Sequence, residues 1–166
     1  MPIIRPFHGI LYDPAVVGPL EQVVAPPYDV IGSEEQDRLY EASPWNVIRL
    51  DLSRESDRYG SACTVYREWR ANGVLVRDRE AAFYVYSQGY RSEDGAARER
   101  WGFFARLRLE DFSSRKILPH ERTLDAAKAD RLELQRACRA NLSSIFGIYS
   151  IPGWSLREAL APALTP

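Results

Sequence analysis

The chain has 166 residues, which is the size of one ordinary domain. Its 45% hydrophobic and 27% charged residues are the proportions of a globular protein and exclude a mainly disordered chain. The net charge of −1 argues against a general nucleic-acid binder, and no apolar run approaches the roughly 20 residues of a membrane-spanning helix.

Charge is unevenly distributed along the chain. Residues 1–90 hold 9 basic and 13 acidic residues, a net charge of −4, whereas residues 91–139 hold 12 basic and 9 acidic residues, a net charge of +3. The second stretch is therefore expected to present either a surface that attracts anions or an ordinary solvated face.

The two cysteines, Cys63 and Cys138, are too few for a disulfide scaffold and too isolated for a zinc cluster. The first residues lack the charged start and apolar run of a secretion signal. We therefore expect a cytoplasmic protein with two free thiols. Both cysteines lie in helical-looking segments, where small buried side chains are the ordinary role of cysteine.

The first 32 residues predict little regular structure. Residues 3–12 form a short apolar run broken by a proline and a glycine, which predicts an edge strand and a turn. Residues 14–19 contain two prolines and a glycine and indicate an irregular loop. The paired prolines Pro26 and Pro27 fix an extended backbone and remove two N–H donors, so a rigid loop is expected around them.

The next three elements are predicted from capping signals and periodicity. Residues 33–42 open with a Ser-Glu-Glu-Gln capping box and predict a helix. Residues 46–52 alternate apolar and polar side chains, which predicts a half-buried strand with Arg49 and Asp51 together on its polar face. Residues 57–72 have helical spacing and end at an Asn-Gly stop signal.

The second half predicts a hairpin and two further helices. Residues 82–88 and 101–109 have strand composition and are separated by a polar turn, which predicts an antiparallel hairpin. Residues 125–140 have helical composition, residues 145–149 predict a last strand, and a second capping box opens a helix at residue 155. This order predicts an α+β fold with a mixed sheet and flanking helices.

The residues before the helix at 125 carry the sharpest chemical signal. A helix N-terminus presents unpaired N–H groups and binds anions. Arg122 would add a bidentate fork to a phosphate, Thr123 would cap the helix or bind a phosphate oxygen, and His120 would donate to a phosphate or shuttle a proton. The alternative is a surface loop with a capping threonine and a charged, solvated helix.

Charged residues elsewhere form further candidate sites. On the helix itself, Lys128 and Arg131 are candidates for binding anions, and Asp130 suits a Mg²⁺ ion. The stiff loop would hold the Asp29 carboxylate as a base or metal ligand, or in a structural turn. Arg49 and Asp51 would form a ligand site or a surface ion pair.

Several strings occur together in one order along residues 2 to about 150. The chain resembles the bacterial and archaeal family catalogued as domain of unknown function 1015 in the strings Pro6-Phe7-x-Gly9, Tyr12-Asp13-Pro14, Val24-Ala25-Pro26-Pro27-Tyr28-Asp29-Val30, Asn46-x-Ile48-Arg49-Leu50, Tyr86-x-Gln88, Gly102-Phe103, Leu118-Pro119-His120-Glu121-Arg122-Thr123, Lys128-x-Asp130-Arg131-Leu132 and Ile145-Phe146. The resemblance implies that residues 1–150 form the family core domain. Residues 151–166 would start a truncated C-terminal region or form a short docked helix.

The resemblance also implies an activity. The family is associated with free L-serine kinases, which make O-phosphoserine from a nucleotide donor, ATP or ADP, on a fold similar to that of ParB and sulfiredoxin. By this resemblance His120, Arg122 and Thr123 would hold the donor phosphates and Glu121 or Asp29 would act as the base. Asp51 or Asp130 would hold Mg²⁺, and Arg49 would bind a carboxylate or phosphate. The alternatives are a non-catalytic, ParB-like module that binds a nucleotide or nucleic acid, and an inactive fragment of uncharacterised function.

Overall fold

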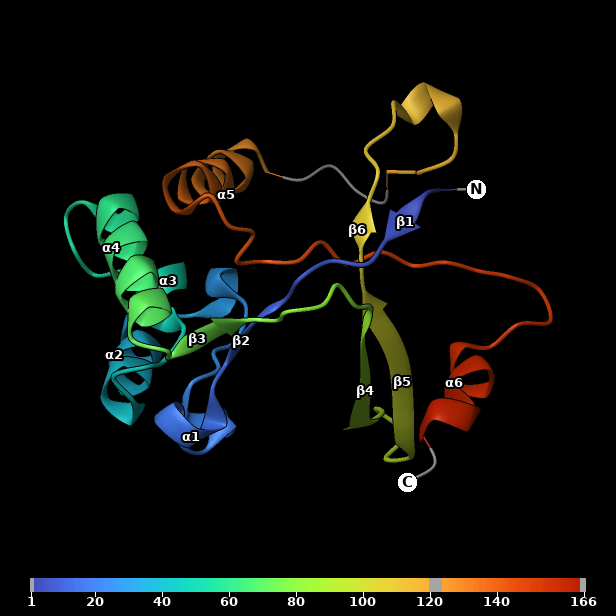
Figure 1. Ribbon diagram of the computed structural model, residues 1–166, viewed down its shortest axis with the longest axis horizontal. Coiled ribbons are helices and arrows are strands. Elements are labelled where there is room, and N and C mark those ends of the chain that lie inside the picture. Colours follow the sequence, from blue (N-terminus) through green and yellow to red (C-terminus); the bar gives the residue numbers. More distant parts are fainter. Residues whose placement is uncertain (1, 120–123, 165–166) are drawn as a thin grey trace. The chain divides into compact units, whose positions relative to one another are not determined.

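The computed structural model describes residues 2–119 and 124–164, which divide into two compact units (Figure 1). Unit 1 takes its described residues from 2–9, 79–119 and 146–164, and unit 2 takes them from 10–78 and 124–145. The predicted α+β class is confirmed, with the described strands paired as three two-stranded antiparallel ladders. No helix within the described ranges is both long and apolar enough to cross a membrane.

Unit 2 is mainly helical. Its elements are β2 (Ile10–Tyr12), α1 (Pro14–Val17), two short 3₁₀ turns (Leu20–Gln22 and Tyr28–Val30), α2 (Ser33–Ala42), α3 (Ile48–Asp51), α4 (Arg58–Ala71), β3 (Leu75–Arg77) and α5 (Asp125–Cys138). Strands β2 and β3 pair antiparallel, with Tyr12 opposite Leu75. The predicted helices at 33–42, 57–72 and 125–140 are all confirmed to within two residues at each end.

Two buried clusters hold unit 2 together. In the first, the Trp69 ring lies 5.9 Å from the Tyr12 ring and 6.0 Å from the Trp45 ring, and these aromatic contacts add to the burial of apolar surface. The second joins α4 to α5 and contains both cysteines. Cys63 and Cys138 are free and buried, and burial, followed by the neighbouring Cys63, raises the pKa of the Cys138 thiol.

The predicted strand at 46–52 is wrong, because residues 48–51 form the short helix α3. The Ile48 N–H donates to the Asn46 side-chain oxygen at 3.0 Å, which satisfies one donor of the first turn. Ile48 and Leu50 are both buried in this turn, so the alternation that favoured a strand reflects burial of a helical turn instead. Consequently Arg49 and Asp51 do not lie side by side on a strand face.

Two other expectations are also corrected. Residues 14–17 form the helix α1 where an irregular loop was expected, because Asp13 caps it by accepting from the Ala15 N–H at 2.9 Å and Gly18 ends it at φ +74°. Residues 145–149 form no strand. They have no ladder partner within the described part of the chain, and Ile145 is 94% exposed.

Unit 1 is built around the predicted hairpin, which is confirmed. Its elements are β1 (Ile4–Arg5), β4 (Tyr84–Arg91), β5 (Ala97–Phe104), β6 (Arg106–Leu107), a 3₁₀ turn (Phe112–Ser114) and α6 (Leu156–Leu164). Strands β4 and β5 pair antiparallel over their whole length, and β1 pairs with β6 (Figure 1). Gly95 closes the hairpin turn at φ +79°, a conformation that favours glycine.

One glycine in the hairpin makes a testable packing prediction. Gly102 lies opposite Tyr86, and a Cβ at position 102 would fall 2.5 Å from Tyr86 Cζ. The tyrosine ring therefore occupies the space that the missing side chain leaves. We expect Gly102→Ala to lower the free energy of unfolding by about 1 kcal/mol, because the ring must move. Gly89→Ala, in the same hairpin with open space around it, should be neutral or slightly stabilising in urea unfolding. Equal effects of the two substitutions would contradict this account.

Candidate functional site

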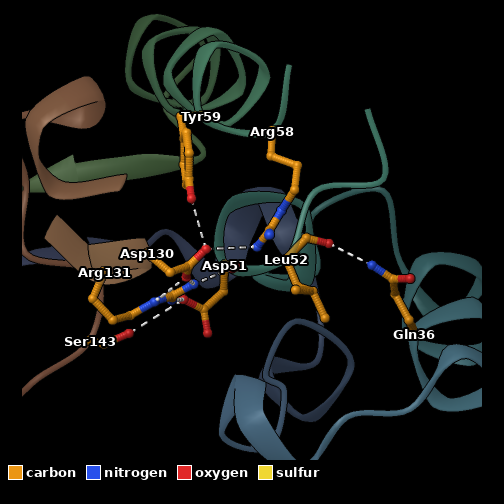
Figure 2. A network of polar contacts seen from close by, with 8 residues as sticks. All are labelled: Gln36, Asp51, Leu52, Arg58, Tyr59, Asp130, Arg131 and Ser143. Carbon is orange, nitrogen blue, oxygen red and sulfur yellow. Dashed lines mark hydrogen bonds and ion pairs between the residues drawn. The ribbon is translucent and has the colours of Figure 1, made fainter. Parts of the chain in front are cut away.

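The predicted site residues that the structure brings together surround Arg131 in unit 2 (Figure 2). We call this group the Arg131 cluster, and its members are Asp51, Arg58, Tyr59, Asp130, Arg131 and Ser143. They come from the end of α3, the start of α4, the middle of α5 and the segment after α5. Residues far apart in the sequence thus meet in one polar network.

The Arg131 guanidinium is held on its edges and on one face. Its Nε and Nη2 donate to Asp130 Oδ2 at 2.9 and 2.5 Å. Its Nη1 donates to Asp51 Oδ1, and its Nη2 also donates to the Asp51 backbone oxygen at 3.0 Å. The Tyr28 ring lies against the guanidinium, with Arg131 Cζ 3.8 Å from the ring centroid. Arg131 therefore ties α5 to the end of α3 and to the proline-rich loop.

Asp130 is bonded on its other oxygen as well. Its Oδ1 accepts from the Tyr59 hydroxyl at 2.9 Å and lies 3.3 Å from Arg58 Nη2. Ser143 completes the cluster by donating to Asp51 Oδ1 at 3.3 Å. The side chains of Asp51, Asp130 and Arg131 are only 14%, 18% and 20% exposed, so their charges interact with little screening by solvent.

The cluster shifts the protonation equilibria of its members. Burial acts to raise the pKa of Asp130, but the hydrogen bonds from Arg131 and Tyr59 and the charges of Arg131 and Arg58 hold it below its usual value. The hydrogen bond to Asp130, assisted by burial, raises the pKa of Tyr59. For Arg131, burial lowers the pKa and the two carboxylates raise it, with a net rise. The cluster therefore holds a carboxylate–guanidinium pair in its charged form.

Local sequence explains how α4 presents its two side chains to the cluster. Asp57 caps α4 by accepting from the Gly60 N–H at 3.0 Å. A Cβ at position 60 would fall 2.0 Å from Asp57 Oδ2, so this close cap requires glycine. Because the cap fixes the first turn of α4, Arg58 and Tyr59 are held toward Asp130 from the first two helical positions.

The carboxylates do not fit a Mg²⁺ ion in this arrangement. Both oxygens of Asp130, and Oδ1 of Asp51, already accept from N–H or O–H groups of the protein. Mg²⁺ requires free oxygen ligands in octahedral geometry. Within the described ranges, no group of three His, Cys, Asp or Glu residues is placed to hold a metal ion. The predicted metal ligands Asp51 and Asp130 thus form a shared ion-pair network around Arg131.

The other predicted site residues lie elsewhere. Asp29 is exposed on the 3₁₀ turn beside Tyr28. Arg49 donates to the Tyr40 backbone oxygen at 2.8 Å and is stacked on the Tyr40 ring, with its buried Nε unpaired. Lys128 pairs with Asp125 at 2.7 Å on the exposed side of α5. The predictions for His120, Glu121, Arg122 and Thr123 fall outside the described residues. The described helix α5 begins at Asp125, as expected, with Leu124 as its N-cap.

Three members of the Arg131 cluster, and the tyrosine that stacks on Arg131, were not identified from the sequence. Tyr59 and Arg58 occupy ordinary first-turn positions of α4, and no pattern links them to Asp130, 71 residues away in the case of Tyr59. Ser143 carries no signal either. Tyr28 belongs to the proline-rich string that drew attention to Asp29, so a signal existed there, although it pointed to the neighbouring side chain.

The cluster makes stability depend on pH in a defined direction. The folded state lowers the pKa of Asp130. The ionised side chain therefore adds to the free energy of unfolding above its unfolded-state pKa of about 3.9, and this contribution is lost as the pH falls through its folded-state pKa. We expect Asp130→Asn to destabilise the chain at about pH 6 and to cost progressively less as the pH falls below about 4. Urea unfolding across this range measures the difference, and a difference that does not change with pH would contradict the charged pairing.

Comparison with known proteins bears on the family alone. A family model described as "Protein of unknown function (DUF1015)" matches residues 4–166, almost the entire chain. No curated protein and no solved structure matches it.

Proposed function

The chain belongs to the DUF1015 family, and we propose that it is a small-molecule kinase that transfers a phosphoryl group from ATP or ADP to free L-serine. One observation supports this proposal most strongly. Asp51, Asp130 and Arg131, three residues predicted to serve one site, converge on the helix that follows the His120–Thr123 string. The identities of the phosphoryl acceptor, L-serine, and of the donor, ATP or ADP, rest on the family resemblance.

In this proposal the Arg131 cluster positions the site and does not bind the substrate. The donors of Arg131 point to Asp51 and Asp130, so its role is to fix α5 against α3 and α4. Fixing α5 fixes its N-terminus, where unpaired N–H groups and the positive end of the helix dipole favour anions. The phosphate ligands are then His120, Arg122 and Thr123.

The transfer itself requires positioning and charge neutralisation. The serine hydroxyl oxygen attacks the terminal phosphorus of the donor while the bond from that phosphorus to the bridging oxygen breaks. The hydroxyl proton passes to a carboxylate, Glu121 or Asp29, and the products are O-phosphoserine and the nucleotide shortened by one phosphate. Mg²⁺ would arrive with the nucleotide and neutralise phosphate charge, and no step is assigned to it through Asp51 or Asp130.

Substitutions at the string test the proposal. We expect Arg122→Ala and His120→Ala each to lower O-phosphoserine formation by about 100-fold or more, the usual loss when a donor to developing charge is removed. Arg136→Ala is the matched control, because Arg136 lies on α5, the helix that follows the string, is 65% exposed and, among the described residues, pairs only with Glu133. Turnover that is unchanged in both string variants would refute the site assignment.

A second candidate function is a non-catalytic module that binds a nucleotide. This function needs no catalytic base, and both carboxylates of the Arg131 cluster already accept hydrogen bonds from the protein. This candidate predicts a nucleotide-dependent rise in melting temperature without formation of O-phosphoserine. Measuring both quantities on the same sample separates the two functions.

A further inference from the structure

Unit 1 contains a basic groove on the ladder of β1 and β6. The groove has a volume of about 410 Å³ and is lined by Ile3, Arg5, Arg106, Leu107 and Arg108. We propose that it binds a small oxyanion carrying at least two negative charges, of the diphosphate class. This inference does not rest on the proposed kinase activity.

The strand register gathers the three arginines on one face. Arg5 lies directly opposite Arg106 in the antiparallel ladder, where β1 and β6 run side by side (Figure 1). The Arg108 N–H donates to the Ile3 backbone oxygen at 2.9 Å, which continues the pairing by one step. Because side chains alternate between the faces of a strand, Arg106 and Arg108 share the face of Arg5, while Ile4 and Leu107 belong to the opposite face.

Arg5 and Arg106 face each other with no ion pair to a carboxylate in the described part of the chain. Like charges directly opposite in a ladder destabilise it. Within the described residues, none of the three arginines has an ion-pair partner. Glu110, the next carboxylate along the chain, bonds Lys116 Nζ at 2.5 Å and also interacts electrostatically with Arg108, so the unbalanced pair is Arg5 and Arg106. An anion placed between Arg5 and Arg106 would therefore relieve a repulsion that the fold leaves in place.

The class of ligand follows from geometry and size. Planar guanidinium groups bind phosphate oxygens through paired N–H donors, and three such groups match a ligand with more than one charged oxygen pair. The groove volume falls within the roughly 300–1,000 Å³ of small-molecule sites. The groove is confined to two short strands and one flanking residue of each, and the chain as a whole has a net charge of −1, which disfavours a nucleic-acid polymer.

Titration calorimetry of the full chain with sodium pyrophosphate, at low and constant ionic strength, tests the proposal. We expect saturable binding that Arg5→Gln and Arg106→Gln each weaken by roughly tenfold or more. The matched control is Arg91→Gln, which removes the same charge from the turn end of the hairpin in unit 1 and should change affinity less than about twofold. Without any anion, Arg106→Gln should raise the melting temperature, because one repulsive charge is gone.

Four results would overturn the proposal. The first is the absence of pyrophosphate binding by the wild-type chain, and the second is equal binding by all four proteins. The third is binding that survives Arg106→Gln and disappears in Arg122→Ala, which would place the anion at the proposed donor site. The fourth is a short oligonucleotide that binds through Arg5 and Arg106 when pyrophosphate does not, which would make the groove a nucleic-acid contact.

Discussion

Arg131→Met is expected to lower the free energy of unfolding by about 3 kcal/mol, which corresponds to a fall of roughly 6–12 °C in melting temperature. The substitution keeps most of the side-chain volume and removes the guanidinium. Asp51 and Asp130 would then remain as two neighbouring, mostly buried carboxylates without their shared cation. Removing one partner of such a pair costs far more than losing an exposed pair, because the remaining charges stay desolvated.

The matched control for this substitution is Arg136→Met on the same helix. Arg136 is exposed and pairs only with Glu133 among the residues that the structure describes, so its replacement should change stability by about 0.5 kcal/mol or less. A double-mutant cycle sharpens the test. Asp130→Asn should cost much less in the Arg131→Met background than in the wild type, because the two side chains share one network. Additive effects would show that the cluster contributes no coupled stability.

Asn46→Asp is expected to lower the free energy of unfolding by a similar or greater amount, about 3–5 kcal/mol near neutral pH. Asn46 is fully buried, and its amide nitrogen donates to the backbone oxygens of Gln22 and Val24 at 2.8 and 3.0 Å. A carboxylate oxygen at this place would face two carbonyl oxygens. The substitution therefore replaces two hydrogen bonds by two repulsive contacts with almost no change of shape.

The effect of Asn46→Asp should also depend on pH. Burial beside carbonyl oxygens raises the pKa of the introduced carboxyl above its unfolded value of about 3.9. The deficit relative to wild type should therefore be smallest below about pH 4 and grow as the pH rises through the folded pKa. Asn141→Asp, at an exposed position after α5, should be close to neutral in the same urea titrations. A large loss of stability at both positions would show that the effect does not come from the buried hydrogen bonds of Asn46.

Local signals in the sequence predicted most helices and the long hairpin. The helix at 125–138 and the hairpin at 84–104 depend on periodicity and turn residues within a short window. The segment 46–52 shows where such signals fail. Its alternation is that of a strand, but the Asn46 side chain satisfies donors and acceptors from two segments and stabilises a helical turn.

The sequence predicts most of the charged residues of the candidate site, but not which of them form ion pairs with one another. Asp51, Asp130 and Arg131 were each singled out, but the contact between Arg131 and Asp51 joins residues 80 positions apart. Nothing in the local pattern distinguishes a carboxylate that binds a metal ion from one that binds an arginine. The same limit applied to the ladder of β1 and β6, where the opposition of Arg5 and Arg106 depends on a register set by tertiary structure.

The most direct test of the kinase proposal is ³¹P nuclear magnetic resonance of the purified chain with L-serine, Mg²⁺ and either ATP or ADP. The proposal predicts a phosphomonoester signal of O-phosphoserine that requires both serine and a nucleotide, is lost in Arg122→Ala and persists in Arg136→Ala. A folded chain whose melting temperature rises with the nucleotide, yet which forms no phosphomonoester with either donor, would contradict the kinase and leave the nucleotide-binding module in its place.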